Sequence, residues 1–176
     1  MLNENYLDSV KQQFLYYKSL GEKTMAQLKP EELFMQPNED CNSIAMIVQH
    51  LAGNMLSRWS NFLTSDGEKE WRNRDAEFET VLKTKEELMQ KWDEGWACLM
   101  NAINGINPAQ LDNIILIRNE PHTVVQAINR QLAHYPYHVG QMVFFAKQLK
   151  GNSFESLSIP KNKSDDFNKE KFGAAK

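Results

Sequence analysis

The chain contains four histidines, and two of them, His134 and His138, lie four positions apart. In a helix, residues four apart lie on the same face, so both imidazoles can reach one metal ion. A third histidine, His50, borders the apolar stripe of an earlier helical segment. Three nitrogen ligands leave a coordination position open, which is typical of catalytic zinc sites. The sequence thus predicts a metal site of His50, His134 and His138, with His122 outside it, although such a pair also occurs by chance on helix surfaces.

A metal ion held by three imidazoles would lower the pKa of a bound water or polarise a bound thiolate. Imidazole suits zinc, nickel, iron and copper, so the pattern leaves the metal open, with zinc or nickel expected. Pro136 lies between His134 and His138, inside an apolar stripe that continues through it. A proline inside a helix costs about 3 kcal/mol or more. A local rule broken in this way tends to mark a functional site.

Polar residues one or two helical turns from these histidines are candidates for the wall of the same site. They are Asn54, Ser57 and Arg58, which follow His50, and Gln141, which follows His138. Asn54 or Ser57 could orient a metal-bound water. Ordinary polar contacts between helices are the alternative for each of them.

Arginines near the site could receive an anionic group of a substrate, because a guanidinium binds a carboxylate or phosphate through two parallel hydrogen bonds. The candidates are Arg58, Arg72 and Arg74. Alternatively, these arginines form surface ion pairs with the acidic residues Glu68, Glu70, Asp75 and Glu77. Asp75 and Glu77 are also candidate general bases, but nothing in the sequence places them near the histidines.

Four segments with helical periodicity must position these residues. They cover about residues 5–28, from Asn42 or Ser43 to about 64–67, 85–106, and from Thr123 to about Lys150. Residues 65–84 have no sustained period and are interpreted as a long connection with one short helical turn. The apolar run at residues 114–117 is predicted to be extended or to form part of a small hairpin.

Four amphipathic helices, each with one apolar stripe, bury those stripes most simply against one another. The predicted fold class is therefore all-α, an antiparallel four-helix bundle over residues 1–150. Trp59, Trp92 and Trp96 are expected in its core. Residues 151–176 are polar and rich in lysine, and we expect them to pack loosely on the bundle as a tail.

Composition narrows the class of protein further. The chain has 176 residues, of which 41% are hydrophobic and 24% charged, which is typical of a soluble globular domain. A formal net charge of −3 argues against a nucleic-acid partner. No apolar run approaches the roughly 20 residues that cross a membrane, and the N-terminus does not resemble a secretion signal. Cys41 and Cys98 could form one disulfide, but such sparse use of cysteine suits a reducing compartment, so a cytoplasmic location is expected.

Two motifs together resemble a known group of proteins. They are SIAMIVQHLA at residues 43–52, which contains His50, and HxxxHxGQ at residues 134–141, which contains His134 and His138. Both resemble the DinB-like superfamily of bacterial four-helix proteins. The segments at residues 53–59 and 66–78 are similar to an uncharacterised branch of it. The resemblance extends over the chain to about Lys150.

This resemblance implies an up-down-down-up bundle, a homodimer, and a metal held by His50, His134 and His138 with water as a further ligand. Some relatives are thiol transferases that use bacillithiol or mycothiol, in which the metal activates the thiol; many members have no established activity. Val139 stands where a basic residue is common in the superfamily.

Two functions follow as hypotheses. The first is a metal-dependent enzyme acting on a small molecule, either a thiol S-transferase with bacillithiol as co-substrate or a hydrolase. The second is a non-catalytic metal-binding bundle with a role in stress or in protein interaction. A chain that binds no metal is the third alternative.

Overall fold

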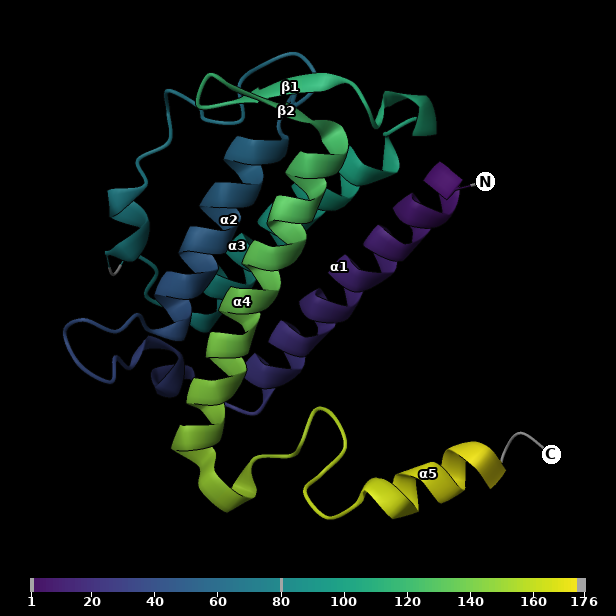
Figure 1. Ribbon diagram of the computed structural model, residues 1–176. Helices are drawn as coiled ribbons and strands as arrows, with labels where there is room; N and C mark the ends of the chain where they lie inside the picture. Colours follow the sequence, from purple (N-terminus) through teal and green to yellow (C-terminus); the bar gives the residue numbers. More distant parts are fainter. Residues whose placement is uncertain (1, 80, 174–176) are drawn as a thin grey trace.

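The computed structural model describes residues 2–79 and 81–173, which are mostly helical (Figure 1). The helices are α1 (Leu2–Ala26), α2 (Ile44–Trp59), α3 (Lys85–Asn104), α4 (Val124–Lys150) and α5 (Ser164–Gly173). Two short strands, β1 (Ile114–Ile117) and β2 (Glu120–Thr123), pair in antiparallel fashion. Short 3₁₀ turns lie at Pro30–Phe34, Asp75–Phe78, Pro108–Gln110 and Gly151–Ser153. The all-α class expected from the sequence agrees broadly with this structure, apart from the small sheet.

Side-chain caps determine where the long helices begin. The Ser43 hydroxyl accepts a hydrogen bond from the Met46 amide at 3.2 Å, and the Thr123 hydroxyl accepts one from the Gln126 amide at 3.1 Å. Both caps satisfy amides that a first helical turn leaves without partners, and they confirm the predicted starts of α2 and α4. The predicted end of α2 is wrong, because the helix stops at Trp59 and Asn61 adopts a positive φ of 50°.

The four long helices lie side by side in two pairs. α2 packs against α3, and α1 packs against α4. Figure 1 shows α1 and α4 running in one direction and α2 and α3 in the other. Two consecutive helices that run in the same direction need a long crossover, and residues 60–84 supply it. α4 continues through Pro136 without interruption.

Aromatic rings fill the space between the helices. Trp59, Trp92 and Trp96 are all buried, which confirms their predicted place in the core. Tyr135 is fully buried as well, and its hydroxyl joins two helices. It accepts a hydrogen bond from Trp59 Nε1 and donates one to Asn54 Oδ1, both at 3.0 Å. This chain of hydrogen bonds connects the core with the polar face of α2.

The strands form a hairpin whose turn is held by the crossover. Arg118 and Asn119 occupy the turn with φ of 56° and 60°. The Asp66 carboxylate accepts hydrogen bonds from both of their amides, at 2.8 and 2.7 Å, and from the Glu68 amide at 2.7 Å. The Gly67 amide donates to the Leu116 carbonyl at 2.8 Å. The crossover and the hairpin, which are about 50 residues apart in sequence, therefore form one unit.

The segment after α4 returns to the end of α1 before it leaves the helices. Gln27 Oε1 accepts a hydrogen bond from the Glu155 amide at 2.7 Å, and Gln27 Nε2 donates to the Glu155 carbonyl at 3.2 Å. The described residues of α5 are exposed. Residues 174–176 of the predicted tail lie outside the described residues.

Cys41 and Cys98 are both free thiols. Among the described helices, none is long and apolar enough to cross a membrane.

The hydroxyl of Tyr135 provides a test of this core. Tyr135→Phe removes the group that pairs with Trp59 Nε1 and Asn54 Oδ1, and leaves two buried polar atoms without that partner. We expect the free energy of unfolding to fall by about 1–3 kcal/mol, as measured by urea denaturation. Tyr16→Phe is the matched control, because the Tyr16 side chain is 51% exposed. Equal stability of the two variants would contradict the proposed role of the hydroxyl.

Candidate metal centre

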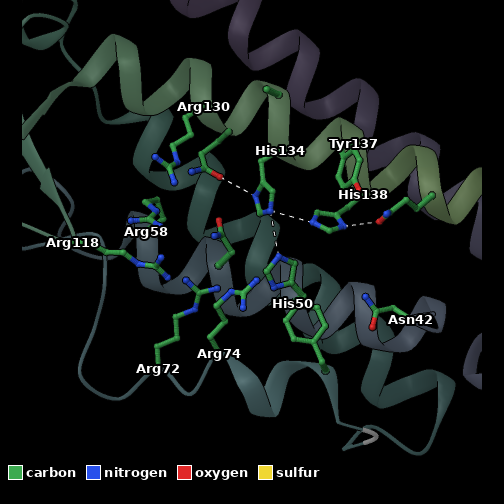
Figure 2. A pocket seen from close by; sticks show the side chains of 15 residues that line it. Asn42, His50, Arg58, Arg72, Arg74, Arg118, Arg130, His134, Tyr137 and His138 are labelled. Carbon is green, nitrogen blue, oxygen red and sulfur yellow. Dashed lines mark hydrogen bonds between the residues drawn. The ribbon is translucent and has the colours of Figure 1, made fainter. Parts of the chain in front are cut away.

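The structure brings His50 of α2 together with His134 and His138 of α4, as the sequence predicts (Figure 2). His134 Nε2 lies 3.3 Å from His50 Nε2 and 3.1 Å from His138 Nε2. One ligand nitrogen from each ring lies within 4.8 Å of the other two. Nitrogen ligands about 2.0–2.1 Å from a tetrahedral zinc ion lie roughly 3.3 Å from one another. The two separations from His134 Nε2 match this spacing, and the three rings lie close enough together that they could hold a metal ion.

The Nδ1 atom of each ring faces an oxygen on the opposite side. His50 Nδ1 lies 2.9 Å from Glu77 Oε2, His134 Nδ1 lies 3.3 Å from Gln131 Oε1, and His138 Nδ1 lies 2.8 Å from Gln141 Oε1. A neutral imidazole donates from one nitrogen and accepts at the other. Because these oxygens accept from Nδ1, all three Nε2 atoms present lone pairs to the same point. Three nitrogen atoms with free lone pairs are suitable ligands for a cation, so the three histidines could hold a metal ion.

Gln131 and Gln141 owe their positions to helical geometry. They lie three residues before His134 and three residues after His138, on the same face of α4. Both follow from the helical row that contains the two histidines. Gln141 was a predicted neighbour of the site, and the structure places it in direct contact with the ring of His138.

Glu77 is the partner that sequence reasoning missed. It lies in the short 3₁₀ turn Asp75–Phe78, and its carboxylate also accepts two hydrogen bonds from Arg72, at 2.8 and 3.0 Å. The sequence offers Glu77 only as a surface ion-pair partner or an unplaced base, because residues 65–84 have no period. Asp75, the other candidate base, is exposed.

The packing of Glu77 against α2 depends on Gly53. A Cβ atom at position 53 would lie 2.2 Å from Glu77 Oε1 and 2.7 Å from Glu77 Cδ, so any larger residue would displace the carboxylate. A glycine inside a helix costs about 1 kcal/mol relative to alanine. A glycine at position 53, inside a helix, is therefore the sequence feature that indicates close packing against α2 at this point. It does not show that Glu77 is the residue that packs there.

Burial and neighbouring charges shift the pKa values of three side chains in this site. Burial is the largest effect on His134, and together with the charges of His138 and His50 it lowers the pKa to about 3. Burial also lowers the pKa of His138, against the hydrogen bond with Gln141. Burial alone would raise the pKa of Glu77, but the hydrogen bonds from His50 and Arg72 and their charges lower it below its usual value. Near neutral pH, His134 is thus neutral and Glu77 is ionised.

The histidines lie in the wall of a cavity of about 710 Å³. Asn54, Arg58 and Gln141, three of the residues predicted beside the metal, also line it. Asn54 uses its oxygen to accept from Tyr135, which determines the orientation of its amide. Ser57 is not among the residues described in the wall. It is buried, and its hydroxyl donates to the Gly67 carbonyl at 2.9 Å.

Two other residues considered from the sequence lie away from the cavity. His122 is on β2, where its Nδ1 lies 2.9 Å from the Glu120 carbonyl, so it does not belong to the histidine cluster. Val139 is buried in the core with 1% of its surface exposed. Val139 is not among the described residues of the cavity wall, whose positive side chains lie at other positions.

Comparison with known proteins supplies a family but no activity. A family model described as "Protein of unknown function (DUF1572)" matches residues 1–163. No curated protein matches the chain.

The contact between Glu77 and His50 can be tested by metal affinity. We expect Glu77→Gln to weaken metal binding roughly 10- to 100-fold, because the carboxylate orients the imidazole of His50 and raises its basicity. Gly53→Ala should act in the same direction by displacing the carboxylate, although alanine is the better helix former. Competition with a fluorescent chelator measures both. Glu79→Gln, a change at an exposed neighbour, is the control. Equal metal affinity of Glu77→Gln and Glu79→Gln would contradict the role of Glu77.

The lowered pKa of His134 predicts how the stability of the folded protein depends on pH. The pKa of His134 falls from its usual 6.5 to about 3 on folding, so between these values the unfolded chain binds more protons than the folded one. Protonation therefore favours unfolding, and metal-free protein should lose stability as the pH falls below about 6.5. The lowered pKa of Glu77 acts in the same direction at lower pH. Urea denaturation of chelator-treated protein at several pH values measures this loss, and His134→Gln should reduce it. A stability that does not change across this range would contradict the prediction.

Proposed function

We propose a metal-dependent enzymatic function for this chain, which belongs to the family described as "Protein of unknown function (DUF1572)". A divalent metal, zinc or nickel, would be held by His50, His134 and His138. The reaction would be the transfer of a thiol to a small molecule, with bacillithiol as co-substrate, or the hydrolysis of a small molecule. The observation that carries the proposal is the convergence of three Nε2 lone pairs in the wall of a 710 Å³ cavity.

A bound metal ion would supply Lewis acidity, lowering the pKa of a coordinated water or thiol so that a nucleophile forms near neutral pH. The side chains of the protein have three separate tasks. Glu77, Gln131 and Gln141 hold the imidazoles in the tautomer that exposes Nε2. Phe78 stacks on the ring of His50 with centroids 4.8 Å apart and covers one of its faces. Asn54, in the cavity wall, can orient a reacting group through its amide N–H.

A catalytic role fits these observations better than a purely structural one. Structural zinc sites are closed by four protein ligands, whereas the cluster in this cavity consists of three imidazoles and leaves a position for a substrate or water. The cavity can also be reached from solvent, because Tyr137 in its wall is 63% exposed. A metal that served stability alone would need neither feature.

We further propose that the fold is a DinB-like up-down-down-up four-helix bundle over residues 1–150, with the polar tail as an appendage. The directions of α1 to α4 and the long crossover between α2 and α3 support this assignment. The homodimer, the cytoplasmic location and the small-molecule substrate remain predictions.

Metal binding itself is the first test. Untagged protein purified without a metal-affinity column should contain about one divalent metal per chain by elemental analysis. His138→Ala should lose that metal, because two imidazoles remain of three. His122→Ala is the matched control, since its ring lies outside the cavity, and it should keep the metal. Wild-type protein without stoichiometric metal would overturn the proposal.

Turnover separates the enzyme from the non-catalytic alternative. Metal-loaded protein is supplied with an electrophile and bacillithiol, or with hydrolysable esters and amides. We expect product formation that His138→Ala abolishes and His122→Ala preserves. A protein that binds metal, gains thermal stability from it and converts neither class of substrate would favour the non-catalytic metal-binding bundle.

A further inference from the structure

All the arginines of the chain line the cavity that contains the three histidines. The chain has five arginines and fifteen lysines. The arginines come from α2, the crossover, the hairpin turn and α4, and they are Arg58, Arg72, Arg74, Arg118 and Arg130. No lysine is among the described residues of the wall. A guanidinium differs from an ammonium in its planar fork of donors, which matches the two oxygens of a carboxylate or phosphate.

The protein itself neutralises only part of this positive charge. Glu68 accepts ion pairs from Arg72 at 3.5 Å and from Arg118 at 3.1 Å, and lies 4.0 Å from Arg58. Glu77 pairs with Arg72 as well. Two carboxylates thus serve three arginines. Among the ion pairs of residues 2–79 and 81–173, none involves Arg74 or Arg130. The cavity is therefore strongly positive in a chain whose formal net charge is −3.

The burial of the positively charged Arg58 side chain costs free energy. Its side chain is only 5% exposed, and its Nε and Nη1 atoms have no hydrogen-bond partner in the described chain. A buried guanidinium is normally fully paired. Arg58 also packs closely against Gly67, since a Cβ atom at position 67 would lie 2.7 Å from its Nη1 atom. A buried and incompletely paired cation in a cavity wall favours the binding of an anion in that cavity.

Three of the five arginines lie in a different part of the cavity from His134 and His138. Figure 2 shows Arg58, Arg118 and Arg130 to one side of His134 and His138 on the other. Arg58, Arg72 and Arg130 all line this cavity. One small molecule can therefore contact arginines with one of its ends and the histidines with the other.

We infer that the cavity binds a small molecule with a carboxylate or phosphate group, which Arg58 and Arg130 receive while the rest of the molecule lies at the three histidines. The inference deepens the proposed function, since it assigns a substrate class to the same site. The binding of the anion itself depends on the arginines and not on the metal. The two ideas can therefore fail separately.

The test measures the binding of simple anions by titration calorimetry. Inorganic phosphate and acetate are titrated into protein loaded with zinc and into chelator-treated protein, in a buffer of low ionic strength. We expect at least one of the two anions to bind in both states. The anion with the higher affinity identifies the group as phosphate or carboxylate. Affinity should fall with added salt, as it does for charge-assisted binding.

Two arginine variants assign this binding to the cavity. Arg58→Gln should weaken it by on the order of tenfold or more, because it removes a charge-assisted contact in a buried position. Since Arg58 is buried, this variant can also lower stability. Arg130→Gln is the safer variant, because Arg130 is exposed; it should weaken binding several-fold without lowering the melting temperature. Lys91→Gln removes one positive charge on α3, outside the cavity wall, and should change nothing.

Each result supports or overturns the inference. Anion binding that survives chelation and weakens in both arginine variants supports it. Binding that disappears with the metal, or that Arg130→Gln leaves equal to Lys91→Gln, overturns it, as does the absence of any binding. If anions bind through the arginines but the protein contains no metal, the anion site stands and the proposed enzymatic function fails.

Discussion

Three imidazole lone pairs that face a common point are the arrangement on which the rest of this structure depends. Burial and the charges of His138 and His50 lower the pKa of His134 to about 3, so this ring is neutral near neutral pH. Such a cluster gains little by itself from the hydrophobic effect or from internal hydrogen bonds. It persists because each ring is held from behind by a carboxylate or an amide oxygen. These polar contacts to Nδ1 leave the Nε2 atom of each ring free to accept.

The crossover between α2 and α3 makes this arrangement possible. Because α2 and α3 run in the same direction, the connection must travel the length of the helices, and it runs beside α2 on the way (Figure 1). It delivers Glu77 to His50, Gly67 to Arg58 and Asp66 to the hairpin turn. A segment with no secondary-structure period of its own also supplies part of the cavity wall, through Arg72, Arg74 and Phe78. Long connections in compact domains commonly carry function.

Charge is distributed unevenly between this cavity and the remaining surface. The lysines lie elsewhere on the chain, whereas the arginines gather at the cavity. Glu68 and Glu77 limit the mutual repulsion of the arginines without removing the excess. A guanidinium keeps its charge when it is partly desolvated, whereas the ammonium of a lysine is more readily neutralised. This difference explains why the buried position beside Gly67 carries an arginine.

Local rules in the sequence were sufficient for the helices and for the histidines. Ser43 and Thr123 cap helices because their hydroxyls reach amides three residues away, and His134 and His138 share a face because a helix repeats every 3.6 residues. The place of Glu77 and the gathering of the arginines were decided by tertiary structure alone. These features depend on contacts between residues that are up to about 80 positions apart, across a crossover with no period to reveal its path. The sequence by itself determined which side chains could bind a metal, and only the folded chain decided which other groups surround them.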